Sequence, residues 1–204
     1  MAQHPRREKE YAAKEPDSAR RVIYKVGHST MELETFVELL RETGVDMVAD
    51  VRTIPRSLHN PQFNKETLSP YLRVRRIKYL HLKELGGLRR HVKDDPRNAG
   101  WHNASFRGFA DYMQTPEFAA GLEELIAWAG KRTVAIMCAE AVPWRCHRSL
   151  IGDALLIRGV EVIDVFPSGT LKPHHLSPLA AVDGNRLTYP AVPEDDASDE
   201  RLRG

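Results

Sequence analysis

Two cysteines eight residues apart, Cys138 and Cys146, are the side chains of this chain best suited to covalent chemistry. Cys146 begins the run Cys146-His147-Arg148, which joins a thiol, an imidazole and a guanidinium. Cationic neighbours lower the pKa of a thiol, and the resulting thiolate is its nucleophilic form. The run therefore predicts a catalytic cysteine, with Cys138 as a second candidate. A packing role is the alternative for both, because free cysteine is among the most buried residue types.

His28 and Glu140 are the candidates for proton transfer. His28 follows a short apolar run, and Glu140 lies two residues after Cys138. Imidazole and carboxylate groups act as general acids and bases when their environment tunes the pKa. The alternatives are local, since His28 could simply hydrogen-bond its own turn and Glu140 could pair with a nearby arginine.

A third group of residues has the chemistry to bind a substrate. Asp50 and Arg52 are two positions apart, so their side chains share a face of an extended strand and could instead form a structural ion pair. Two adjacent glycines, Gly86 and Gly87, are also typical of a turn with positive φ. The predicted substrate-binding residues are Asp50, Arg52, Glu84, Gly86, Gly87, His147 and Arg148.

The elements that must position these residues follow from the hydrophobic pattern. Short apolar runs predict buried strands, and apolar residues three or four apart between those runs predict helices. The predicted strands span 22–27, 45–51, 77–82, 133–138 and 159–166. Strand alternating with helix predicts an α/β fold, with a mostly parallel sheet of about five strands and helices on both faces.

The carboxyl ends of parallel strands meet at one edge of the sheet, where open sheets of this type bind ligands. His28, Asp50 and Cys138 each lie at or just after such a strand end. The pattern also predicts a helix from about Cys146 to Arg158, whose unpaired first-turn N–H groups would favour an anion or a thiolate. We therefore expect one concave site that is lined by His28, Arg52, Glu84, Glu140 and Arg148.

The length of 204 residues suits a single domain. Residues 1–20 are charged and lack an apolar period, which predicts a flexible N-terminal arm. Residues 181–204 include a run of acidic residues and predict an acidic flexible C-terminal tail. The folded domain is therefore expected to span residues 21–180.

Composition excludes several classes of protein. Thirty basic and 28 acidic residues give a net charge of only +2, so any anion site must be local. Two cysteines cannot build the disulfide framework of a small secreted protein, and the N-terminus lacks the apolar segment of a signal peptide. No run approaches the ~18 apolar residues that span a bilayer. We expect a cytoplasmic protein without a membrane partner and leave its oligomeric state open.

Separated motifs occur in a fixed order: YKVGHST at 24–30, DVRTIPRS at 50–57, YLHLKELGG at 79–87, FRGFADYM at 106–113 and CAEAVPWRCHRSLI at 138–151. Together they resemble the uncharacterised domain-of-unknown-function family 488 (DUF488) over about residues 22–166. The resemblance implies that the candidate residues are motif positions of that family. It implies no reaction and no cofactor.

Three functions fit these residues. The first is an enzyme that binds an anionic or nucleotide-like substrate at the C-terminal edge of the sheet. The second is a non-catalytic nucleic-acid-binding or regulatory module, indicated by basic residues within 73–78 and 89–93. The third is a metal site made by the two cysteines and His147, although a gap of eight residues is too long for a zinc knuckle.

Overall fold

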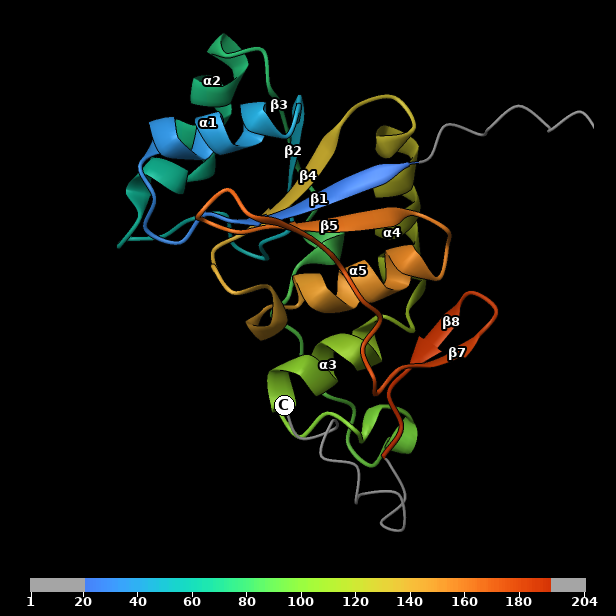
Figure 1. The fold of residues 1–204 in the computed structure, drawn as a ribbon. Coiled ribbons are helices and arrows are strands. Elements are labelled where there is room, and N and C mark those ends of the chain that lie inside the picture. The colour runs from blue at the N-terminus through green and yellow to red at the C-terminus, as the bar shows by residue number, and fades with distance from the viewer. Residues whose placement is uncertain (1–20, 192–204) are drawn as a thin grey trace, which may run out of the picture.

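A six-stranded sheet forms the centre of the protein in the computed structural model, which describes residues 21–191 (Figure 1). Its strands are β1 (Val22–Gly27), β2 (Met47–Asp50), β3 (Lys78–His81), β4 (Val134–Cys138), β5 (Glu161–Val165) and β6 (Leu171–Pro173). They lie in the order β3-β2-β4-β1-β5-β6, and only the β5–β6 pair is antiparallel. The predicted α/β fold is confirmed. β6 adds an edge strand to the predicted five, and its three exposed residues show no apolar pattern.

Helices cover both faces of the sheet (Figure 1). One layer consists of two helices, α1 (Leu33–Glu42) and α2 (Lys65–Val74). The other layer consists of three helices, α3 (Ala104–Tyr112), α4 (Pro116–Ala129) and α5 (Arg148–Leu156). Each layer packs on its own apolar cluster of buried strand residues, so the sheet separates two cores.

The strands are buried because alternate side chains enter these two cores. Ile23 and Ile136 belong to the cluster under α4 and α5, whereas Val26 and Met137 belong to the cluster under α1 and α2. All four side chains are fully buried. Burying one such side chain contributes about 1.5–3 kcal/mol relative to leaving it exposed. This two-sided burial explains why the strands are continuous apolar runs.

The connections of the sheet leave a crevice between β2 and β4. β2 continues through α2 to β3 on one side, whereas β4 continues through α5 to β5 on the other side. Neighbouring parallel strands whose connections diverge in this way leave a ligand-sized gap beyond their carboxyl ends. The residues that follow Asp50 and Cys138 therefore face the same gap.

The folded part of the chain continues past residue 180, so the predicted boundary of the C-terminal tail is wrong. Residues 181–191 include a hairpin of β7 (Ala181–Asp183) and β8 (Arg186–Thr188). Leu187 and Tyr189 are buried, and the Tyr189 hydroxyl donates to Asp153 at 2.8 Å. Strands of three residues carry too little pattern to be recognised, and contacts with the domain hold them in place.

The predicted arm (1–20) and the rest of the predicted tail (192–204) lie outside the described residues. Within residues 21–191, no helix combines the length and apolar character needed to cross a membrane.

Candidate functional site

A pocket of about 700 Å³ opens at the crevice between β2 and β4. Six of the predicted site residues line it: Arg52, Gly87, Cys138, Glu140, Cys146 and His147. They come from three segments that are distant in the sequence, at residues 52, 87 and 138–147, and that meet at the C-terminal edge of the sheet. We call this pocket the thiol pocket. His28, Asp50, Glu84, Gly86 and Arg148 do not line it.

Cys146 does not lie in the first turn of a helix, as the sequence predicted. Residues Pro143–Arg145 form a 3₁₀ turn, Cys146 has extended backbone angles (φ −129°, ψ 143°), and α5 begins at Arg148. Pro143 favours the turn because its φ is already suited to a first helical position. The Cys146 sulfur is therefore influenced by neighbouring side chains rather than by the N–H groups of a helix.

Arg148 is the most unusual of these neighbours. Its side chain is fully buried, its Nε donates to the Cys146 sulfur at 3.3 Å, and its Nη2 donates to the backbone oxygen of Glu140. Its Nη1 has no hydrogen-bond partner among the described residues. A guanidinium stays charged inside a protein, and a buried charge requires a counter-charge. The Cys146 thiolate is the group placed to supply it.

The two cysteines titrate differently because they share a proton. A hydrogen bond from the Cys138 thiol, together with His147 and Arg148, outweighs burial and holds the pKa of Cys146 well below its ordinary value. The same hydrogen bond and burial raise the pKa of Cys138 well above its ordinary value. Of the two cysteines, Cys146 is therefore the one whose surroundings favour the thiolate form.

His147 completes this arrangement. Its Nε2 lies 3.0 Å from the backbone oxygen of Val51, so Nε2 carries the hydrogen. The Nδ1 atom lies 3.5 Å from the Cys146 sulfur, where it donates to the thiolate when the ring carries a hydrogen on both nitrogens. The ring fills the space where Gly87 has no side chain, because a Cβ there would overlap the imidazole.

The glycine pair serves close packing rather than an unusual backbone conformation. Neither Gly86 nor Gly87 has a positive φ. A Cβ on Gly86 would lie 2.6 Å from the Thr53 hydroxyl, and a Cβ on Gly87 would overlap His147. The alternative of a positive-φ turn is therefore wrong. The two glycines instead allow loop 83–89 to pack closely against the pocket wall.

Asp50 and Arg52 form a buried ion pair beneath the pocket. Arg52 Nε and Nη2 donate to the two oxygens of Asp50 at 2.9 and 2.6 Å. Nη2 also donates to the backbone oxygen of Phe63 at 2.7 Å, and Nη1 lies 3.2 Å from His28. Four of the five N–H groups of Arg52 are therefore engaged, which leaves one for a ligand.

His28 supports Arg52 from below and is closed to solvent. Its Nδ1 donates to the Ser29 backbone oxygen at 2.8 Å, and its Nε2 accepts from Arg52. Burial lowers the pKa of His28 to about 4, so the ring is neutral near pH 7. His28 therefore helps to position Arg52 and does not line the pocket.

Glu84 and Glu140 have different surroundings. The Glu84 side chain packs beside Gly121 of α4, away from the thiol pocket. Glu140 is exposed at the pocket, where its carboxylate accepts from the Val142 backbone N–H at 3.0 Å. Of the two carboxylates, only Glu140 can reach a ligand in the pocket.

A second polar cluster lies on the other side of α5, and the sequence did not predict it. Lys25 contacts Asp164 at 3.0 Å and His174 at 2.9 Å, while His174 and Tyr189 both reach Asp153. These contacts tie the C-terminal segment to β1, β5 and α5. Charged residues inside otherwise apolar strand runs, such as Lys25 and Asp164, are the signal that indicates such a cluster.

The thiol pocket also contains a possible set of metal ligands. The sulfurs of Cys138 and Cys146 and a ring nitrogen of His147 all lie within 4.8 Å of one another. Two thiolates and one imidazole are a known zinc ligand set, and catalytic zinc sites keep a further position open. The hydrogen bond from His147 to Val51 matches the support that metal-ligating histidines usually have.

A family model described as "Domain of unknown function DUF488" matches residues 32–155, which include both cysteines, Arg52 and Arg148. Comparison with curated proteins and with solved structures found no match. The family match covers more than half of the sequence and includes most of the thiol pocket. The chain therefore belongs to the DUF488 family.

Proposed function

We propose that the protein is an enzyme that uses the Cys146 thiolate as a nucleophile toward a small anionic or nucleotide-like substrate. The observation that carries this proposal is the contact between the buried Arg148 guanidinium and the Cys146 sulfur. Arg148 stabilises the anionic form of the thiol, which is the reactive form. Cys146 is buried but lines the pocket, so a substrate in the pocket would lie against this residue.

Charge on the pocket wall supports an anionic substrate. Arg56 and Arg145 line the pocket and are exposed, and Arg52 has one free N–H group. Arg56 is only weakly held, because its ion pair with Glu66 is 3.7 Å long and exposed. Guanidinium groups bind carboxylate and phosphate oxygens through paired hydrogen bonds.

The remaining polar groups have roles that follow from their positions. The Cys138 thiol stabilises the Cys146 thiolate through its hydrogen bond. Glu140 is the carboxylate at the pocket that can accept a proton from a water molecule. In this proposal the Cys146 sulfur displaces a leaving group from an acyl or phosphoryl centre of the substrate, and that group takes a proton from solvent. Water that gives a proton to Glu140 then breaks the sulfur–substrate bond, which releases the product and restores the thiolate.

The reactivity of the two thiols tests the proposal. The rate of iodoacetamide alkylation is measured against pH for the unaltered protein, Cys138→Ala and Cys146→Ala, with peptide mapping of the label. We expect Cys146 to react well below its ordinary pKa of about 8.5 and faster than Cys138. A Cys146 that stays inert up to about pH 9, or that reacts no faster than Cys138, refutes the thiolate nucleophile.

A metal centre is a second candidate function for the same residues, supported by the cluster of two sulfurs and one imidazole nitrogen. Zinc bound there would hold a reactive water in place of a free thiolate. Metal analysis of protein purified without chelator distinguishes the two functions. Stoichiometric zinc that protects both cysteines from alkylation supports the metal centre, and its absence together with rapid Cys146 alkylation supports the nucleophile.

A non-catalytic nucleic-acid-binding module has less support. Arg75 stacks on Tyr71 at 3.5 Å and pairs with Glu34, and Arg89 stacks on Tyr112 at 3.7 Å. These contacts use one residue of each of the two predicted basic clusters. A gel-shift experiment in rising salt tests what binding remains, because phosphate contacts weaken steeply with salt.

A further inference from the structure

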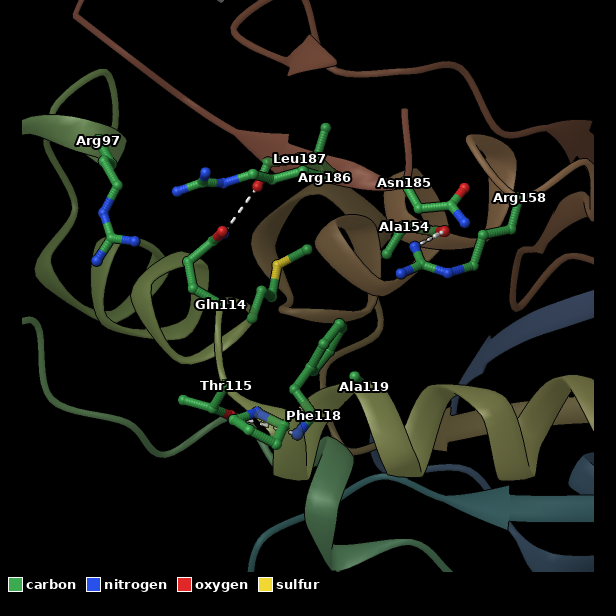
Figure 2. A pocket seen from close by; sticks show the side chains of 12 residues that line it. Arg97, Gln114, Thr115, Phe118, Ala119, Ala154, Arg158, Asn185, Arg186 and Leu187 are labelled. Atoms are coloured by element: carbon green, nitrogen blue, oxygen red, sulfur yellow. Dashed lines mark hydrogen bonds between the residues drawn. The ribbon is translucent and has the colours of Figure 1, made fainter. Parts of the chain in front are cut away.

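A second cavity, of about 430 Å³, lies between the α3–α4 junction, α5 and the turn of the β7–β8 hairpin (Figure 2). Arginines from three distant segments line it: Arg97, Arg158 and Arg186. In Figure 2, Arg97 and Arg158 stand on opposite sides, and Arg186 extends between them. We call this cavity the arginine cleft. It shares no lining residue with the thiol pocket.

The charge of the arginine cleft is unbalanced at its surface. No aspartate or glutamate is among its lining residues, which also include the amide side chains of Gln114 and Asn185. The first turn of α4 forms part of the wall and adds the partial positive charge of a helix N-terminus. Asp95 and Glu123 pair with Arg97 and Arg158 from outside the lining, so Arg186 is the charge that an anion in the cleft would balance.

The three arginines differ in how far the protein already satisfies them. Arg97 is held by Asp95, and the Arg158 Nη1 atom donates to the Ala154 backbone oxygen at 2.9 Å. The Nε of Arg158 is buried without a hydrogen-bond partner and lies 3.7 Å from Glu123. Arg186 is exposed and has no hydrogen bond or ion pair within residues 21–191. Arg158 and Arg186 therefore have donors left for a ligand.

The hairpin holds Arg186 at the cleft. Gly184, at the hairpin turn, has φ +57°, and Arg186 is the first residue of β8. Gln114 donates to the backbone oxygen of Leu187 at 2.7 Å, and the buried Tyr189 follows two residues later. The chain that follows Arg186 is thus fastened to the domain, which limits the backbone entropy lost when the hairpin binds a ligand.

We propose that the arginine cleft binds the phosphate groups of a phosphorylated ligand, as a site separate from the thiol pocket. The remaining guanidinium donors of Arg158 and Arg186, which come from different segments of the cleft wall, match the several oxygens of a di- or triphosphate better than those of a single carboxylate. The volume of the cleft accommodates such a group, and the Asn185 amide supplies an uncharged contact beside it. The source of the phosphates is either a free nucleotide or a nucleic-acid strand.

Calorimetric titration of the full chain at low salt tests this proposal with three probes, inorganic pyrophosphate, ATP and a single-stranded oligonucleotide. We expect pyrophosphate to bind, and Arg186→Ala to weaken it at least about tenfold, which is the effect of losing a charged hydrogen bond. Arg186 is exposed and unpaired, so its removal leaves the fold intact. Arg73→Ala is the matched control, because Arg73 is exposed on α2, on the opposite face of the sheet.

Tighter binding of ATP than of the oligonucleotide identifies a nucleotide site, and the reverse identifies a nucleic-acid site. Binding that is unchanged in Arg186→Ala, or equally reduced in Arg73→Ala, overturns the proposal, as does the absence of binding by all three probes. Cys146→Ala separates the two sites. It should leave pyrophosphate binding unchanged, and a loss of binding in that variant places the phosphates in the thiol pocket instead.

Discussion

Arg148 and Arg186 show how one residue type serves opposite purposes in two regions of this molecule. Arg148, behind the thiol pocket, is fully buried and donates a hydrogen bond to the Cys146 sulfur. Arg186, at the arginine cleft, is exposed and without a partner in residues 21–191. A buried charge changes the chemistry of its neighbour, whereas an exposed and unpaired charge is available to a ligand. Burial, rather than residue type, therefore assigns the two roles.

The largest expected difference between the two arginines is in stability. In Arg148→Met, the Cys146 sulfur loses its positively charged neighbour. The free energy of unfolding should fall by about 3–5 kcal/mol, because breaking a buried pair has a cost of that size. Arg186→Ala should change it by no more than about 0.5 kcal/mol. Urea denaturation measures both. Similar losses in the two variants would contradict the comparison.

The buried pair of Asp50 and Arg52 extends the comparison to carboxylates. Asp50→Asn leaves a buried guanidinium unpaired and should cost about 3–5 kcal/mol. The control is Asp46→Asn, because Asp46 pairs with Arg132 at 3.0 Å on the surface, where a pair contributes about 0–1 kcal/mol. Equal midpoints in urea for the two variants would show that the pocket does not depend on its buried charges.

Gly87→Ala should produce an intermediate effect that is confined to the thiol pocket. The added Cβ overlaps the His147 ring, so the ring must move from its hydrogen bond to Val51. Overpacking of this kind costs about 1–3 kcal/mol, and the alkylation rate of Cys146 should fall. Pyrophosphate binding at the arginine cleft is the readout that should stay constant. A fall in both would show that the two sites are coupled.

The smallest expected effect is the pH dependence of the stability that His174 contributes. His174 holds the C-terminal segment that carries the hairpin. Burial alone would lower the pKa of His174, but hydrogen bonds to Asp153 and Asp164 outweigh it and raise the pKa. The stabilising contribution of His174 is therefore complete below its ordinary pKa of about 6.5, and it is lost as pH rises through the higher folded value.

Melting temperatures of the unaltered protein and His174→Asn should consequently converge as pH rises above neutrality. A difference that is constant across this range, or that grows with pH, would contradict the role of the His174 contacts. His175→Asn is the control, because His175 is the next residue and makes none of these contacts.

The elements of the fold follow from local pattern. The predicted strand at 22–27 matches β1, and the other four predicted strands contain β2 to β5 with small shifts at their ends. Parallel strands bring their carboxyl ends to one edge whatever the details of packing. For that reason the sequence could place Arg52, Cys138 and Cys146 near one another.

The sequence by itself determined the strands, the helices and the meeting of the cysteine, arginine and histidine motifs at one sheet edge. Only the tertiary structure decided that Arg148 faces a sulfur instead of a substrate, that Glu84 turns toward α4, and that the hairpin brings Arg186 to a cleft. The physical reason is that local periodicity specifies which face of an element is buried. The burial and partner of each charge depend on distant segments that pack against it.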